Sequence, residues 1–217
     1  MDKATHVFQA TTTAYITGEI VAKNVSYEDF LRGYDGQHVE WVQGRVIKMS
    51  PVDERHDALS RFLDNLLQVY LELTGGGRVL QDPMVMRPGP DFPARQPDLQ
   101  VLLPESLGYL EQNAVEGPAD LVVEVISPES ARRDQIEKFA EYERAGVREY
   151  WILDPRNHSA QFWVLSEGLF YEARQPNTGN VYQSSVLPHL HISVDLFWRD
   201  PLPGYVETLR LVEAMLA

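Results

Sequence analysis

The chain contains no cysteine, and this absence excludes several classes of protein. It rules out a disulfide framework, thiolate catalysis and a zinc site built from cysteine ligands. Secreted disulfide-stabilised scaffolds are therefore excluded, and a reducing compartment such as the cytoplasm is the expected location. The N-terminal residues also lack the basic segment followed by an apolar segment that marks a signal peptide. No hydrophobic run approaches the length of a membrane span, so we expect no part embedded in a membrane.

Basic residues are scarce. The chain has 19 lysines and arginines and 32 aspartates and glutamates, which gives a formal net charge of −13 at pH 7. Affinity for nucleic acids comes mainly from basic side chains that neutralise phosphates, so this balance argues against a general nucleic-acid-binding protein. It leaves room for a local site. Basic residues gather in the segments 45–61 and 132–148, but acidic residues lie among them, so a solvated mixed surface explains most of these charges.

The rest of the composition is that of a folded globular domain. With 44% hydrophobic and 24% charged residues, a chain of 217 residues can bury a substantial core. Residues 1–24 show no clear periodicity and predict an N-terminal arm with at most one short strand. We expect a domain over 25–198 and a C-terminal helical extension over 199–217.

The periodicity of apolar residues predicts both helices and strands. A short helix should follow Ser26 as its N-cap, and a hairpin over 39–49 should turn at Gln43-Gly44. A Pro-rich loop is expected over 82–96. Longer helices are predicted over 56–73, over 131–145 with Gly146 as its C-cap, and over 204–216. The predicted strands cover 78–81, 97–103, 121–126, 149–154, 160–165, 169–173, 181–187 and 191–194.

This order of elements predicts the fold class. The strands 121–126 and 149–154 are separated by one helix, which is the length of a βαβ crossover, so they should be parallel. We expect an α/β (α+β) fold in which helices flank a mixed central sheet, with extra β-hairpins and a C-terminal helix.

Two carboxylates inside apolar strands are the most informative feature of the sequence. Asp98 opens one run and Glu124 lies within another. Burying a carboxylate is costly unless a partner compensates, and two on neighbouring strands would also repel each other. A divalent cation between them removes both costs, and Mg²⁺ or Mn²⁺ prefers such oxygen ligands. Either residue alone is more simply interpreted as a surface charge, but their occurrence in order with Lys138 favours a metal site.

An ordered set of motifs resembles a known bacterial family. The motifs are Glu40-x3-Gly44, His56 at the start of a helix, Pro97-Asp98, Glu124-Val125-Ile126-Ser127-Pro128, Arg133-Asp134-x3-Lys138-x3-Tyr142, Ala145-Gly146-Val147-Arg148-Glu149-Tyr150-Trp151 and Leu187-Pro188-x-Leu190. Over residues 25–198 the chain is similar to the proteins described as "putative restriction endonuclease", Uma-type members of the PD-(D/E)XK nuclease superfamily. The Pro-Asp pair is a weak signal by itself, whereas the ordered string that ends in Ala-Gly-Val-x-Glu-Tyr-Trp is a strong one.

The resemblance implies a restriction-endonuclease-like core and an endonuclease that hydrolyses phosphodiester bonds of DNA with Mg²⁺ or Mn²⁺ as cofactor. By position, it makes Asp98, Glu124 and the backbone carbonyl of Val125 metal ligands. Glu40 becomes an additional catalytic acid, which acts as a second-metal ligand or through a water. Lys138 would orient or deprotonate the attacking water and stabilise the charge that develops on phosphorus.

The resemblance also implies contacts with the substrate, for which the candidates are His56, Arg133 and Tyr142. Two interpretations of His56 stay open at this point. As the residue that opens a helix it is either simply exposed or placed near the metal, where it contacts phosphate. Tyr150 and Trp151 lie in a strand expected to be central, so we expect them in the core and not in a base-stacking surface.

The position of the lysine departs from the simplest superfamily pattern. The tripeptide that begins at Glu124 ends in Ile126, and the lysine stands on the following helix as Lys138. This displacement is chemically tolerable because the place of the ammonium group matters, not the element that carries it. If Ile136 and Ala140 face the sheet, Lys138 points to the surface. The alternative is that Phe139, Tyr142 and Gly146 face the sheet, and Lys138 then lies on the rim and can bend toward the strand ends.

Two further expectations concern activity and assembly. A binding or assembly module on a nuclease fold, with weak or no catalysis, is the alternative function, and the net charge of −13 motivates it. A homodimer is expected because a nuclease that cuts both strands commonly uses two active sites. The segment 160–194 and the helix 204–216, whose apolar side carries Tyr205, Leu209, Val212 and Leu216, would form the interface. Alternatively, these elements cap the core of a monomer.

Overall fold

The structure, a computed structural model, describes residues 18–217, so the predicted N-terminal arm lies outside the described residues up to position 17. Its centre is a six-stranded sheet with the strand order β11-β10-β9-β8-β6-β4. The strands are β4 (Arg78–Gln81), β6 (Leu99–Leu102), β8 (Leu121–Val125), β9 (Glu149–Asp154), β10 (Ser159–Ser166) and β11 (Phe170–Arg174). β8 and β9 are parallel and the other neighbours are antiparallel, so the predicted mixed sheet and βαβ crossover are confirmed.

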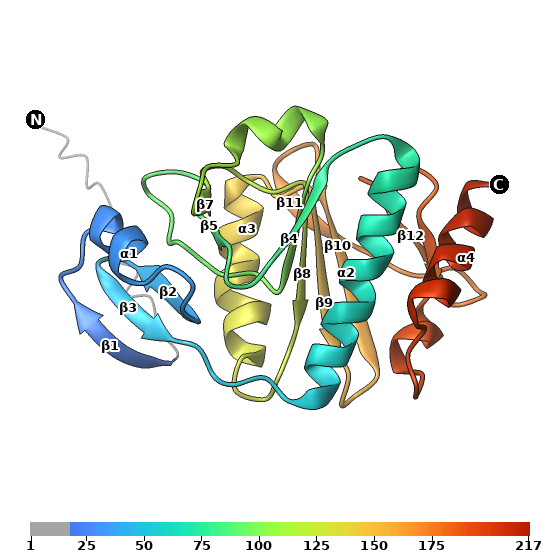
Figure 1. Ribbon diagram of the computed structural model, residues 1–217, viewed down its shortest axis with the longest axis horizontal. Coiled ribbons are helices and arrows are strands. Elements are labelled where there is room, and N and C mark those ends of the chain that lie inside the picture. Colours follow the sequence, from blue (N-terminus) through green and yellow to red (C-terminus); the bar gives the residue numbers. More distant parts are fainter. Residues whose placement is uncertain (1–17) are drawn as a thin grey trace, which may run out of the picture.

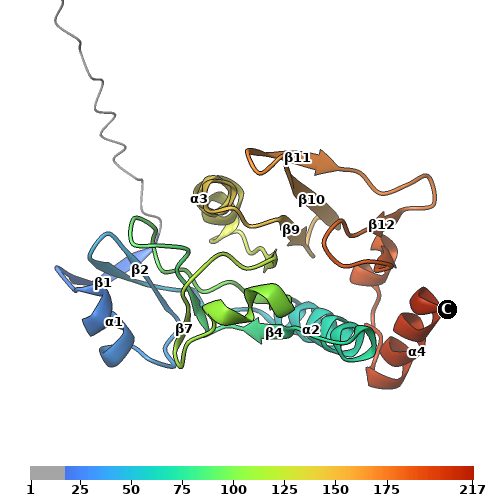
Figure 2. The same cartoon turned by 90° about the horizontal axis from the view of Figure 1, so that it is seen from above.

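Helices cover both faces of this sheet (Figures 1 and 2). α2 (Glu54–Thr74) packs on one face, and α3 (Phe139–Ala145) packs on the other. Successive side chains of a strand point to opposite faces, so Leu121 and Val123 of β8 join the core beneath α2, whereas Val122 joins the core beneath α3. Glu124 has the same parity as Val122 and therefore faces α3. This alternation decides which helix can supply partners to the Glu124 carboxylate.

Local chemistry explains where α2 begins and where both α2 and α3 end. Asp53 caps α2, because its side chain accepts a hydrogen bond from the His56 backbone N–H at 2.9 Å. Gly75 ends α2 with φ of +93°, a conformation that favours glycine. Gly146 ends α3 in the same way, as predicted. In front of α3 the predicted continuous helix is not regular: η2 (Arg133–Lys138) is a π-helical turn.

A second, smaller sheet lies to one side of the central sheet, shown in blue in Figure 1. It consists of β1 (Glu19–Lys23), β3 (Arg45–Lys48) and β2 (Val39–Val42) in that order, with α1 (Tyr27–Gly33) beside it. We call residues 18–48 the N-terminal module. Gln43 and Gly44 both have positive φ, as a tight hairpin turn requires, which confirms the predicted turn. Ser26 caps α1 as predicted, accepting a hydrogen bond from Asp29 N–H.

The remaining elements connect and cover the core. β5 (Val85–Met86) pairs in parallel with β7 (Ala114–Val115), so the prediction of an unbroken loop over 82–96 was wrong at these two residues. β12 (Val181–Gln183) pairs with β13 (His191–Ser193), and the short helical segments are η1 (Pro104–Tyr109) and η3 (Val194–Trp198). The predicted strand 181–187 stops early, because the Ser184 hydroxyl accepts hydrogen bonds from the N–H groups of Val186 and Leu187 and turns the chain.

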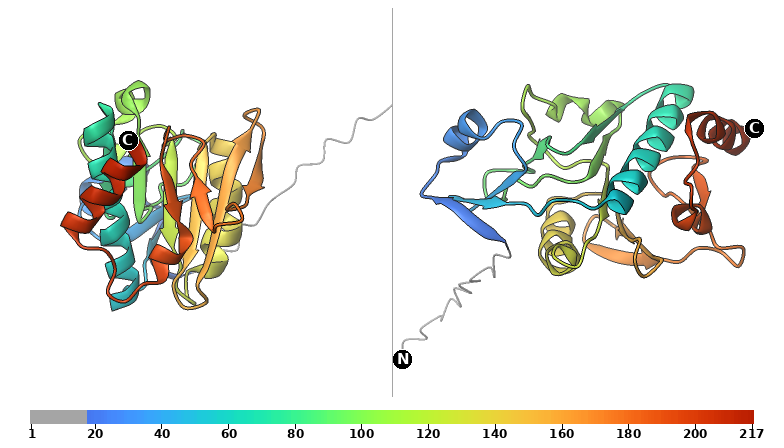
Figure 3. Two further views of the ribbon diagram at one scale, coloured as in Figure 1. Left: turned by 90° about the vertical axis from the view of Figure 1, so that its right-hand side faces the viewer. Right: turned by 60° about the horizontal axis from the view of Figure 1, so that its bottom comes forward.

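α4 (Tyr205–Leu216) is the predicted C-terminal helix and runs beside α2 (Figure 3). Thr208 and Val212 are fully buried. Tyr150 and Trp151 are also fully buried, which confirms their predicted place in the core. None of the helices between residues 18 and 217 has the length and apolar character required to traverse a lipid bilayer.

Candidate active site

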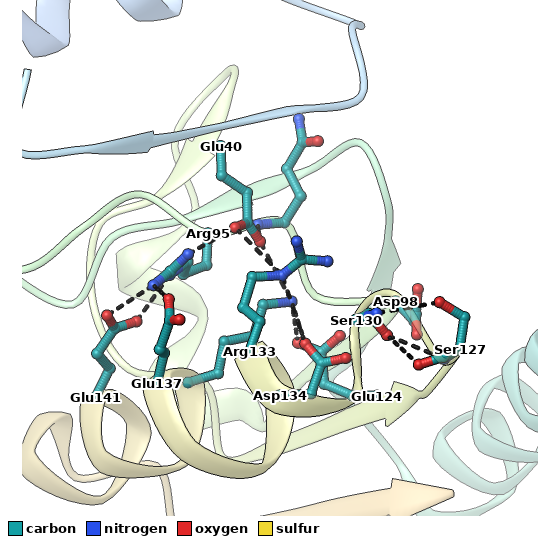
Figure 4. A network of polar contacts seen from close by, with 12 residues as sticks. Glu40, Arg95, Asp98, Glu124, Ser127, Ser130, Arg133, Asp134, Glu137 and Glu141 are labelled. Carbon is teal, nitrogen blue, oxygen red and sulfur yellow. Dashed lines mark hydrogen bonds and ion pairs between the residues drawn. The ribbon is translucent and has the colours of Figure 1, made fainter. Parts of the chain in front are cut away.

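A narrow pocket lies where β6 begins and β8 ends. The two strands are antiparallel, with Leu99 opposite Val123, so the start of one lies beside the end of the other. Segments that are distant in the sequence line the pocket together, and the predicted site residues among them are His56, Asp98, Glu124, Val125, Arg133 and Lys138. Figure 4 shows the polar contacts around it. The structure therefore brings together most of the residues that the sequence singled out.

Asp98 lies against the end of β8. Its Oδ2 accepts a hydrogen bond from the Val125 backbone N–H at 2.6 Å. The same oxygen is 3.2 Å from His56 Nε2. Burial lowers the pKa of His56, but the hydrogen bond and charge of Asp98 outweigh this effect, and the pKa is raised. His56 is thus a buried partner of Asp98, and the interpretation of His56 as a simply exposed residue was wrong.

Lys138 reaches Glu124 from the adjacent helix. Its side chain is only 1% exposed, and Nζ is 2.7 Å from Glu124 Oε1 and 3.4 Å from Asp134 Oδ1. Ile136 is 58% exposed, whereas Phe139 packs against the core. Of the two orientations that the sequence left open, the one that directs Lys138 to the strand ends is confirmed.

The π turn η2 precedes α3 and carries Lys138 as its last residue. A π turn holds more residues than an α turn and shifts the phase of the residues on either side, and such turns frequently occur at functional sites. Around Glu124, Lys138 approaches from η2 and Tyr142 from α3. The Tyr142 hydroxyl donates to Glu124 Oε1 at 3.1 Å. One carboxylate oxygen is therefore held by two donors from successive turns.

Electrostatics at Glu124 favour an additional cation. Burial holds the pKa of Glu124 well above its usual range, Lys138 opposes this effect, and the charges of Asp134 and Asp98 add to it. Burial lowers the pKa of Lys138, but its carboxylate neighbours outweigh burial and raise it. Lys138 is therefore held protonated. A further cation beside Glu124 would lower the carboxyl pKa, so protons and cations compete for this group.

Glu40 lies behind the pocket and not in its lining. It is fully buried, with Oε2 2.7 Å from Arg95 NH1 and Oε1 3.2 Å from Lys138 Nζ. Burial raises its pKa, but the charges of Lys138, Arg95 and Arg133 outweigh this effect and lower the pKa to about 2. Cations already occupy both oxygens. This placement favours a role exerted through Lys138 over the expected ligation of a second metal.

The two remaining candidates for substrate contacts differ in their placement. Tyr142 is buried behind Glu124 and does not line the pocket, so its position favours support of Glu124 over contact with substrate. Arg133 does line the pocket. Its Nε is buried, lies 3.9 Å from Glu40 Oε2 and 3.8 Å from Asp134 Oδ1, and forms no hydrogen bond within residues 18–217. Arg133 is the side chain best placed to accept a new anionic partner.

Two residues of the site were missed. Asp134 lies in a motif that the sequence singled out, and its spacing of four residues from Lys138 on a helix is a signal that could have identified it. Arg95 lies in the Pro-rich loop, where no periodicity indicates burial, yet it is only 2% exposed. The sequence offers no comparable signal for Arg95.

The donor set bears on which metal could bind. Within residues 18–217, no group of three or more His, Cys, Asp or Glu side chains is arranged to hold a metal ion. This speaks against a structural zinc site. Mg²⁺ binds through one or two carboxylates and completes its shell with waters and substrate oxygens, so it does not need such a group. Asp98 Oδ1 and Glu124 Oε2 accept no hydrogen bond from the described residues, and both side chains line the pocket.

Comparisons with known proteins agree with this picture. The model of the Uma2 family, described as "Putative restriction endonuclease", matches residues 27–195. A crystal structure described as "a putative nuclease belonging to DUF820 from Anabaena variabilis" matches with a TM-score of 0.63 at 16% identity, over 79% of this chain and 96% of that chain. At this identity the match shows a common fold. A search of curated proteins gives no match. The match over most of its length shows that the chain belongs to the Uma2 family of restriction-endonuclease-like proteins.

Proposed function

We propose that the protein is a divalent-metal-dependent endonuclease that hydrolyses phosphodiester bonds of DNA. The observation that carries the proposal is the convergence of Asp98, Glu124 and Lys138 on one pocket, from two strands and a helix. Membership of the Uma2 family and a fold shared with a protein described as "a putative nuclease" support the reaction class. The metal and the DNA substrate are the more specific parts of the proposal.

Asp98, Glu124 and the backbone carbonyl of Val125 would hold the metal. A divalent cation in this place would supply Lewis-acid activation of the scissile phosphate and of the attacking water. Asp98 is kept in place by the Val125 N–H and by His56, and Glu124 is kept in place by Lys138 and Tyr142. The chain thus fixes both carboxylates before any ligand binds, which reduces the reorganisation needed for catalysis.

Lys138 would act as a positive charge and hydrogen-bond donor. Its raised pKa keeps the ammonium protonated at neutral pH, so the structure favours orientation of the attacking water over its deprotonation. The ammonium would also stabilise negative charge that develops on the phosphate. Arg133, which lines the pocket, would bind a phosphate oxygen through its guanidinium.

The charges around the pocket bear on the objection raised by the net charge. The chain carries −13 overall, but Lys138, Arg133 and His56 all line the pocket. The carboxylates of Asp98, Glu124 and Asp134 line it as well, so the proposed divalent cation would supply the positive charge that these carboxylates offset. Contacts with the phosphate backbone fix the register of a nucleic acid and carry no sequence information, so this pocket alone specifies no target sequence.

The decisive experiment measures cleavage of supercoiled plasmid DNA with Mg²⁺ or Mn²⁺. The wild type should nick the plasmid. The Asp98→Ala and Lys138→Met proteins should not, whereas Asp57→Ala, on the exposed side of α2, should cleave like the wild type. Equal cleavage by wild type and Asp98→Ala would refute the assignment of the site. A parallel incubation with RNA separates the DNA part of the proposal from the hydrolytic part.

A binding or assembly module without catalysis is the second candidate, and the excess of acidic residues favours it. In that case Lys138 would serve only to neutralise the buried carboxylates. The same assay distinguishes the two functions. Folded wild-type protein that nicks no plasmid above the Asp98→Ala background, with either metal, would support the module and refute the nuclease.

A further inference from the structure

Arg95 is a buried arginine that joins the N-terminal module to α3. Its Nε and NH2 bond the two oxygens of Glu141 on α3, each at 2.7 Å. Its NH1 bonds Glu40 Oε2 on β2, also at 2.7 Å. Figure 4 shows the guanidinium between these carboxylates. A planar guanidinium with fixed N–H directions is suited to hold two carboxylates in one geometry.

Glu40 transmits this constraint to the pocket. While Oε2 is bonded to Arg95, Oε1 lies 3.2 Å from Lys138 Nζ. The same ammonium is 2.7 Å from Glu124 Oε1. Charges of alternating sign therefore run from Glu141 on α3 through Arg95, Glu40 and Lys138 to Glu124 at the edge of the pocket. Arg95 is the second residue in this series of charges and does not line the pocket itself.

We infer that Arg95 is a positioning residue, which holds Glu40 so that the Lys138 ammonium stays beside Glu124. Glu40, Glu124 and Asp134 compete for this single ammonium group. Without Arg95, Glu40 would lose its closest cation while remaining fully buried. An uncompensated buried charge is costly, so Glu40 would draw Lys138 toward itself and away from Glu124. The kinetic consequence rests on the proposed nuclease function, whereas the displacement of Lys138 does not.

The displacement can be measured without any activity. The lysines of the chain are Lys3, Lys23, Lys48 and Lys138; Lys23 and Lys48 are exposed and Lys138 is buried. In ¹⁵N-lysine-labelled protein, the buried ammonium should give a protected Nζ signal, assigned by its loss in Lys138→Met. Arg95→Met should shift this signal or abolish its protection, and Arg95→Lys should restore it in part. An unchanged signal in Arg95→Met would overturn the inference.

The matched control is Arg148→Met, because Arg148 pairs with the buried carboxylate of Asp120 outside the pocket. It should leave the Lys138 signal in place. A shift of the same size in Arg148→Met would mean that any lost ion pair disturbs Lys138, and the specific role of Arg95 would fail. If Arg95→Met does not fold, the Arg95→Met/Glu40→Gln protein removes both charges together. This double variant should fold, and its Lys138 signal should match that of Glu40→Gln alone; a signal that differs between the two would show that Arg95 acts independently of Glu40 and would overturn the inference.

Cleavage kinetics give the second test. Loss of a residue that orients a functional group typically costs about 10–100-fold, so we expect a fall of this size in kcat for Arg95→Met, with KM changed by less than about twofold. If Arg95 acts through Glu40, adding Arg95→Met to Glu40→Gln should cause no further loss of kcat. Multiplicative losses would show an independent structural role and refute the inference. An inactive wild type with the expected NMR shifts would refute the nuclease function but leave the positioning of Lys138 by Arg95 intact.

Discussion

Replacement of Glu40 by Gln should remove a stabilisation that depends on pH in a defined way. Glu40 is fully buried between Lys138 and Arg95, and these charges lower its pKa from 4.5 to about 2 against the effect of burial. A carboxylate with a depressed pKa in the folded state contributes stability above the pKa of the unfolded chain. That stability is lost as the pH falls through the folded-state pKa. Wild type and variant should therefore differ most at neutral pH.

The displacement from 4.5 to about 2 corresponds to about 3 kcal/mol in the free energy of unfolding. We expect Glu40→Gln to be less stable than the wild type by this order at pH 6. By pH 3.5 the difference should narrow by about 1 kcal/mol, because Glu40 has then taken up a proton in the unfolded chain but is still ionised in the folded protein.

Urea unfolding followed by circular dichroism at both pH values measures the difference. Because both proteins share every other titrating group, their difference isolates Glu40. Glu72→Gln, on the exposed side of α2, is the matched control and should match the wild type at both pH values. Equal stability of Glu40→Gln and wild type at pH 6, or a difference that stays constant down to pH 3.5, would contradict the argument.

Three further predictions concern the metal, the buried lysine and assembly. Millimolar Mg²⁺ or Mn²⁺ should stabilise the folded wild type, by about 2.7 kcal/mol at a hundredfold excess over Kd, and so raise its melting temperature. The Asp98→Ala and Glu124→Ala proteins should lose most of this rise. An equal rise in all three proteins would place the metal elsewhere. Lys138→Met should lower the free energy of unfolding by about 3–5 kcal/mol, because it leaves buried carboxylates unpaired. Lys48 is exposed, so Lys48→Met should change the free energy of unfolding little. Similar urea midpoints for the two variants would refute this prediction. Light scattering at micromolar concentration should give a mass near twice 24.7 kDa, since α4 leaves Tyr205, Val206 and Leu209 exposed; a mass near 24.7 kDa would exclude the homodimer.

The sequence predicted those parts of the fold that depend on local patterns. The apolar spacing over 56–73 matches α2, and the Val- and Leu-rich runs around Asp98 and Glu124 match β6 and β8. The parallel pairing of β8 with β9 followed from the length of the connection. These local patterns left the orientation of Lys138 open, and its meeting with Glu124 was expected only from the resemblance to the family.

The rest of the site depends on contacts that no local pattern encodes. The π turn η2 shows no feature in the sequence that separates it from an α-helical segment. Arg95 is buried because carboxylates from β2 and α3 surround it, and these come together only in the folded chain. The actual partners of Glu40 were missed for the same reason. The predicted domain boundaries at 25 and 198 remain predictions.

The buried charges also bear on how the chain reaches a single topology. The hairpins β9–β10 and β10–β11 join strands that are adjacent in sequence, so they can pair early in folding. The contact between Arg95 and Glu40 spans 55 residues and requires the N-terminal module to dock correctly. A misaligned module would bury the same charges without partners, at a cost of several kcal/mol. The ion pairs among Arg95, Glu40 and Lys138 therefore raise the free energy of wrongly docked states. They favour one arrangement of the N-terminal module on the sheet, besides forming part of the site.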